Sequence, residues 1–91
     1  MKNLNFPGLP RILVVDDEPH IRRVLSAILG QCGYDVSLAC DGAEGLEVLR
    51  DNPVDLVILD LMMPGANGLE ILSMIRADPG RADTPVIILT A

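Results

Sequence analysis

Hydrophobic and polar positions divide this chain into two kinds of segment. Three short runs, over residues 11–16, 55–60 and 85–90, each have four consecutive aliphatic residues at their centre, while residues 34–38 alternate between polar and apolar. Aliphatic runs of this length predict strands that are buried on both faces of a parallel sheet, and the alternating run predicts a strand near the edge of that sheet.

Apolar residues between these runs recur at helical spacing and predict three helices. The first begins at Pro19, whose missing N–H is tolerated in a first turn, and ends at Gly33. Its apolar face is formed by Ile21, Val24, Leu25, Ile28 and Leu29. A capping box of Asp41 and Glu44 opens the second helix, which buries Leu46 and Leu49 and stops at Pro53. A similar pattern, Asn67 to Glu70, opens the third helix, which continues through Leu72 and Ile75 to Pro79.

The resulting order is βαβαβαβ, which indicates an α/β protein with helices on both faces of a parallel sheet. We predict a flavodoxin-like, doubly wound sheet with strand order 2-1-3-4. The domain occupies residues 11–91, and residues 1–10 form an N-terminal lead. In this order the topological switch point lies between strands one and three, where ligands bind beyond the carboxyl ends of the strands.

Acidic residues end both of these strands. Asp16 and Asp17 follow the first strand, and Asp60 ends the third, so three carboxylates are expected at one edge of the sheet. Carboxylates at such short distances repel one another, so the site requires a proton or a cation. Oxygen ligands favour Mg²⁺, or alternatively Mn²⁺, over zinc. Aspartate can also accept a phosphoryl group covalently. The alternative interpretation is that Asp16, Asp17 or Glu18 only caps the next helix.

Composition excludes several other classes of protein. The net charge is -6, which opposes binding to a phosphate backbone, and Phe6 and Tyr34 are the only aromatic residues on which bases could stack. We therefore expect no direct binding of nucleic acid by this chain. Cys32 and Cys40 form no metal-binding pattern and are expected to be free thiols. No signal-peptide core or membrane span is apparent, so we expect a cytoplasmic location and no membrane partner.

Three segments, in order and at matching spacing, resemble bacterial response-regulator receiver domains. They are Val14 to Glu18, Asp60 to Glu70 with its D-x-x-M-P-x-x-x-G-x-E pattern, and Ile87 to Ala91. The resemblance implies that Asp60 is the phosphoacceptor for a sensor histidine kinase and that the domain switches a signalling output. It further implies an Mg²⁺ site.

By the same resemblance, Asp17 binds the metal directly, Asp16 binds it directly or through water, and the backbone carbonyl of Met62 completes the protein ligands. Thr90 would be the switch hydroxyl, and Ala91 the small residue that leaves room for the phosphate. Such a domain catalyses its own phosphorylation and is not a turnover enzyme. His20 and the pair Arg22 and Arg23 are expected to be solvated.

The sequence also departs from the family pattern. Receiver domains continue with a fourth helix, a fifth strand ending in a lysine, and a fifth helix, whereas the only lysine here, Lys2, precedes the first strand. The apolar fourth strand would then lie at an open edge, which predicts self-association or a fragment of a longer receiver, with the fragment favoured. We expect such a chain to bind Mg²⁺ but to phosphorylate poorly.

Two other functions remain open. A pseudo-receiver, or a truncated interaction module, would keep the fold without efficient phosphorylation. A phosphatase of the haloacid-dehalogenase type would also use a strand-end aspartate with Mg²⁺, but it requires an Asp-x-Asp arrangement that residues 16–18 do not supply.

Overall fold

A four-stranded parallel sheet forms the centre of the molecule in the computed structural model, which describes residues 8–63 and 68–89. Its strands are β1 (Arg11–Val15), β2 (Asp35–Ala39), β3 (Leu56–Asp60) and β4 (Val86–Leu89), in the order β2-β1-β3-β4. The predicted strand order is therefore confirmed. The strand ends that the structure describes fall within one residue of the predicted ranges.

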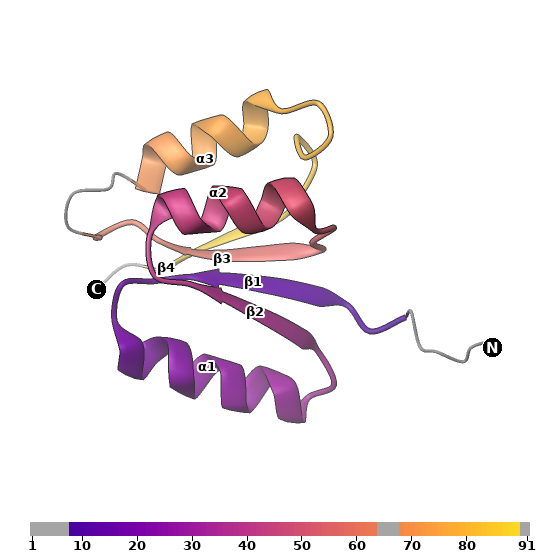
Figure 1. Cartoon of the computed structure of the whole chain (residues 1–91), viewed down its shortest axis with the longest axis vertical. Coiled ribbons are helices and arrows are strands. Elements are labelled where there is room, and N and C mark those ends of the chain that lie inside the picture. Colours follow the sequence, from indigo (N-terminus) through magenta and orange to yellow (C-terminus); the bar gives the residue numbers. More distant parts are fainter. Residues whose placement is uncertain (1–7, 64–67, 90–91) are drawn as a thin grey trace.

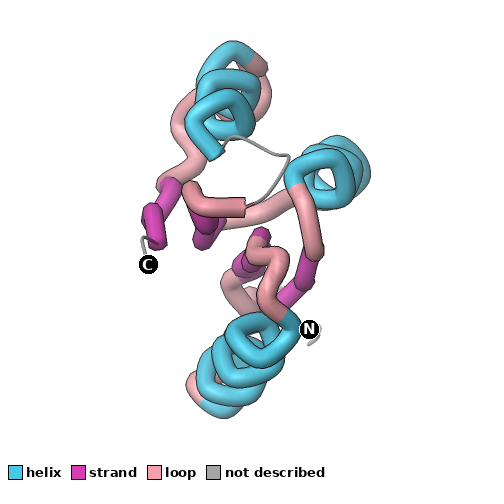
Figure 2. Tube along the Cα trace, turned by 90° about the vertical axis from the view of Figure 1, so that its left-hand side faces the viewer, coloured by secondary structure: helices cyan, strands magenta, loops and turns pink. Residues whose placement is uncertain are grey.

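Three helices cover the two faces of this sheet unequally. Helix α1 (Pro19–Gln31) lies on one side, and α2 (Gly42–Asp51) and α3 (Gly68–Ala77) lie together on the other, as Figure 1 shows. The view in Figure 2, turned by a right angle, has the same arrangement of one helix against two. The sheet therefore separates two apolar layers.

The layer under α2 and α3 is the better buried of the two. It is built around Leu13, Val15, Val57, Leu59 and Ile75, each at most 1% exposed. The layer under α1 contains buried residues from the strands alone: Ile12, Val14 and Ile58.

Helix α1 contributes no buried residue, although its apolar residues follow at the spacing of one continuous helical face. Leu25 and Leu29 pack partly against the sheet, while Ile21, Val24 and Ile28 stay exposed. The physical reason is that α1 is the one described helix on its side, so nothing described covers the flank of its apolar face. The helix itself was predicted correctly.

Local signals account for the observed helix ends. Pro19 is in the first turn of α1. Beyond its last turn Gly33 has a φ of 94°, and the Gly33 and Tyr34 amides donate to the carbonyls of Gly30 and Leu29, as in a Schellman motif. This conformation strongly favours glycine.

The N-terminus of α2 differs in one detail from the predicted capping box. The Asp41 Oδ1 atom accepts from the Glu44 amide at 2.8 Å, as expected. The Glu44 carboxylate, however, accepts from the amide of Cys40 at 2.6 Å rather than from that of Asp41. This hydrogen bond connects the end of β2 to the start of α2. It also lowers the pKa of Glu44. The second predicted box begins at Asn67, which lies outside the described residues.

Candidate functional site

The carboxyl ends of β1 and β3 bring the three predicted acidic residues together. Val15 is paired with Leu59, so Asp16 and Asp60, which follow them, are neighbours across the sheet. One carboxylate oxygen from each of Asp16, Asp17 and Asp60 lies within 4.8 Å of the others. Asp17 is exposed, Asp60 is half-buried and Asp16 is buried. Sequence reasoning thus located this cluster correctly.

Asp16 is the buried member of the cluster, with 4% of its surface exposed. Burial raises the pKa of its carboxyl group, and the nearby charges of Asp60 and Asp17 raise it further. A hydrogen bond from the Glu18 amide to Asp16 Oδ1, at 2.9 Å, opposes this shift by favouring the charged form. The site therefore holds more negative charge than its surroundings readily accommodate.

Asp60 is oriented by the turn that follows it. The Met62 amide donates to Asp60 Oδ1 at 2.8 Å, which fixes one oxygen of the predicted phosphoacceptor. The start of α3 packs closely against this turn, since a Cβ atom at Gly68 would lie 2.7 Å from Leu61 Cα and 2.9 Å from the Asp60 carbonyl oxygen. Only glycine fits at this position without a shift of the backbone.

The main chain around Asp16 is held on two sides. Its amide donates to the Ala39 carbonyl at the end of β2, at 3.1 Å. Its carbonyl accepts from Arg22 Nη1, at 2.7 Å. The expectation that Arg22 belongs to a solvated helix face was wrong, since its guanidinium reaches back six residues to the site. His20 and Arg23 are exposed, as predicted.

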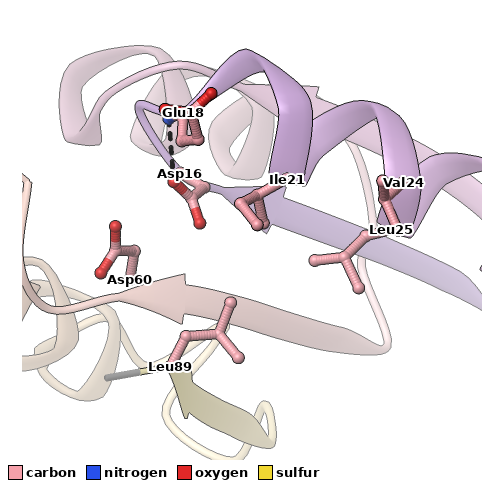
Figure 3. A pocket seen from close by; sticks show the side chains of 7 residues that line it. All are labelled: Asp16, Glu18, Ile21, Val24, Leu25, Asp60 and Leu89. Atoms are coloured by element: carbon pink, nitrogen blue, oxygen red, sulfur yellow. Dashed lines mark hydrogen bonds between the residues drawn. The ribbon is translucent and has the colours of Figure 1, made fainter. Parts of the chain in front are cut away.

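An open pocket of about 490 Å³ extends from these carboxylates along α1. Figure 3 shows Asp16 and Asp60 at one end of it, with the Glu18 amide bonded to Asp16. The rest of the wall is aliphatic and is formed by Ile21, Val24, Leu25 and Leu89. The pocket thus has an acidic end beside the strand ends and an apolar end between α1 and β4.

The donor set at the acidic end fits a small divalent cation. Oxygen ligands alone suit Mg²⁺ or Mn²⁺, and a bound cation would favour the charged form of Asp16, whose pKa is raised by burial and by the charges of Asp60 and Asp17. The roles predicted for individual ligands, including the Met62 carbonyl, stay predictions. Pro64, Thr90 and Ala91 lie outside the described residues, so the predicted switch hydroxyl has no described position.

Comparison with known proteins identifies the family. The sequence model of the response regulator receiver domain family matches residues 12–91. The chain belongs to this family. The receiver domain has its three carboxylates at the switch point of a sheet with the order predicted from its sequence.

Curated relatives include longer regulators. The receiver domain is 43% identical over 81 residues to the DNA-binding response regulator MtrA of Mycolicibacterium smegmatis, covering 89% of this chain and 34% of that protein. It is 42% identical over 83 residues to the DNA-binding dual master transcriptional regulator RpaA of Synechocystis, covering 91% of this chain and 34% of that one. The chain thus spans about a third of the length of these relatives.

Solved structures agree with the fold. The response regulator TrrA of Thermotoga maritima, in complex with Mg²⁺ and BeF, is 46% identical with a TM-score of 0.84, over 91% of this chain and 70% of that one. The N-terminal domain of a response regulator receiver protein from Methanoculleus marisnigri is also 46% identical, with a TM-score of 0.87, over 92% of this chain and 68% of that one. None of the helices described in the receiver domain has the length and apolar character needed to span a bilayer.

Proposed function

We propose that this receiver domain accepts a phosphoryl group on Asp60 from a sensor histidine kinase and thereby switches a signalling output. The observation that carries the proposal is the convergence of Asp16, Asp17 and Asp60 within 4.8 Å at the ends of β1 and β3. Membership of the receiver family supports it. We assign Asp16, Asp17, Asp60 and the Met62 carbonyl as ligands of Mg²⁺, with Mn²⁺ as a substitute.

The residues of the site divide the work of this transfer. A carboxylate oxygen of Asp60 attacks phosphorus, and the bond from phosphorus to the donor's histidine nitrogen breaks, so the electron pair leaves with the histidine. The Met62 amide holds Asp60 in place. Mg²⁺, when bound, neutralises the carboxylates and the incoming phosphate. Asp16 and Asp17 supply the negative charge that attracts such a cation.

Several further assignments belong to this proposal. Thr90 is the hydroxyl that hydrogen-bonds the phosphoryl group, and Ala91 leaves space for it. The domain does not turn over a substrate, because Asp60 itself carries the product. It works in the cytoplasm, where kinases obtain ATP, and an output domain, not this one, would contact nucleic acid.

The test is the intact mass of the chain after incubation with Mg²⁺ and acetyl phosphate. We expect one added phosphoryl group that accumulates slowly, and none in Asp60→Asn or in the presence of EDTA. Asp55→Asn is the control, since Asp55 is an exposed aspartate whose side chain accepts a bond from Arg11 at the other end of the sheet. No addition to the wild type would favour the pseudo-receiver, whereas hydrolysis of a generic phosphomonoester would favour a phosphatase.

A further inference from the structure

Arg22 lies beside the acidic site, and its guanidinium bonds to the main chain there. Its Nη1 atom donates to the main-chain carbonyl of Asp16 at 2.7 Å, and it forms no ion pair among the described residues. We propose that Arg22 is a positioning residue, which fixes the loop carrying Asp16 and Asp17 so that their carboxylates converge on Asp60. The inference rests on the proposed function for its Mg²⁺ readout.

The group that Arg22 contacts belongs to a buried residue. Asp16 is 4% exposed, so its carbonyl has little access to water. A buried carbonyl without a partner is costly, and a charged donor makes the stronger kind of hydrogen bond. Loss of the guanidinium would therefore favour a different path for the main chain between β1 and α1.

Arg22 completes a set of hydrogen bonds around Asp16. The Asp16 amide is bound to the Ala39 carbonyl, and the Asp16 carboxylate to the Glu18 amide. Arg22 adds the bond to the carbonyl, so the main chain is fixed on both sides of the Asp16 side chain. Its own amide donates to the Glu18 carbonyl in the first turn of α1, so Arg22 links the loop to the helix.

A role of Arg22 in positioning and a role through its charge predict opposite changes in Mg²⁺ affinity. A positive charge near a cation site repels the cation, so if Arg22 acted by charge alone, its removal would tighten Mg²⁺ binding, by roughly two- to fourfold. A positioning role predicts the opposite sign. Loss of a group that orients metal ligands typically weakens metal affinity by about tenfold or more.

The experiment compares Arg22→Met with Arg23→Met, which removes the same charge from an exposed neighbour on α1. Mg²⁺ affinity is measured by isothermal titration calorimetry. We expect affinity to fall about tenfold or more in Arg22→Met, and to stay unchanged or rise slightly in Arg23→Met. Arg22→Lys keeps a cationic donor and should recover part of the loss. Equal affinities in the two Met variants, or tighter binding in Arg22→Met, would overturn the inference.

A second readout needs no metal. Amide hydrogen exchange is measured by NMR in EDTA for Glu18, whose N–H donates to Asp16, and for Val14 as an internal control within β1. We expect exchange at Glu18 to accelerate by about tenfold in Arg22→Met, with Val14 and the Arg23→Met variant unchanged. Unchanged exchange at Glu18 would also overturn the inference. If Arg22→Met does not fold, Arg22→Lys carries both readouts, and wild-type values for both in this variant would overturn the inference.

The two readouts distinguish this inference from the proposed function. A wild-type domain that binds no Mg²⁺ would contradict the proposed metal site, while the exchange experiment would still test the positioning role. A wild-type domain that binds Mg²⁺ normally, with Arg22→Met indistinguishable from it in both readouts, would contradict the positioning role alone.

Discussion

At the scale of single residues, the acidic site combines functional chemistry with a cost in stability. Asp16 is buried, and it lies beside two other carboxylates. A pKa raised by burial means that the folded state holds the proton of Asp16 more tightly than the unfolded state does. The protonated Asp16 carboxyl contributes its full stabilisation below the pKa that it has in the unfolded chain. This contribution is lost as pH rises through the higher pKa that it has in the folded state. At neutral pH without metal, the fold therefore carries an unfavourable charge.

We predict that Asp16→Asn stabilises the metal-free domain at neutral pH by about 1 kcal/mol, the Coulomb energy of one close pair of solvated charges. The asparagine oxygen can still accept from the Glu18 amide, so the local bond is kept. The measurement is urea unfolding followed by circular dichroism over a pH series in EDTA.

The advantage of the variant should vanish at acidic pH, where the wild-type carboxyl is protonated, and it should reverse with saturating Mg²⁺, which binds the wild type better. Asp83→Asn, at an exposed aspartate, is the control and should change little. Equal stability of Asp16→Asn and wild type at neutral pH would contradict the prediction.

Some residues of the site could be predicted from the sequence and others could not, for a physical reason. Asp16, Asp17 and Asp60 could be predicted because the carboxyl ends of parallel strands meet at one edge of the sheet. The role of Arg22 could not be predicted, because its position on α1 determines only where its side chain begins. Its long side chain then turns back to a buried carbonyl that no pattern in the sequence reveals.

At the scale of elements, the start of α3 is placed by its contact with the turn after β3. Gly68 is buried there, and a Cβ atom would meet backbone atoms of Leu61 and Asp60. Gly30 in α1 is the opposite case, since nothing lies within 4 Å of the position of its Cβ atom. Two helical glycines thus have different reasons to be glycine.

Replacing each glycine separately by alanine should change the free energy of unfolding in opposite directions. We expect Gly68→Ala to lower the free energy of unfolding by about 1–3 kcal/mol, because the backbone must shift to admit the methyl group. Gly30→Ala should raise it by up to about 1 kcal/mol, because alanine is the better helix former. Urea unfolding of the two variants measures both. A stability loss in Gly30→Ala equal to that in Gly68→Ala would contradict the argument from close contact.

Most elements were predictable because their signals are local. The aliphatic runs, Pro19 and Gly33 determine the strands and the ends of α1 without reference to the rest of the fold. Burial of α1 was not predictable, because apolar spacing shows which face can be buried and not what covers it. The same holds for Glu44, whose reach to Cys40 depends on how β2 approaches α2.

At the scale of the whole molecule, apolar surface remains on the side of α1. Ile28 is 52% exposed and Ile87, in β4, is 50% exposed. Among the described residues, β4 pairs with β3 alone and forms one edge of the sheet. An apolar strand edge of this kind favours pairing with another chain.

We therefore predict that the isolated chain self-associates as its concentration rises. Ile87→Lys should shift it toward the monomer, because a charge on an edge strand opposes pairing. Sedimentation velocity over a wide concentration range measures this, with Ser73→Lys on the exposed face of α3 as the control for added charge. A wild type that stays monomeric throughout would contradict the prediction.

The pairing of β1 with both β2 and β3 has a consequence for synthesis in the cell. This strand leaves the ribosome first of the four, and Leu13 and Val14 in it are fully buried once the fold is complete. Because translation adds about 5–20 residues per second, some seconds pass between the synthesis of β1 and that of β3. During that time the aliphatic side chains of β1 are open to chaperones and to neighbouring nascent chains. Of the four described strands, β1 therefore spends the longest time exposed to misassembly before the sheet that holds the acidic site has formed.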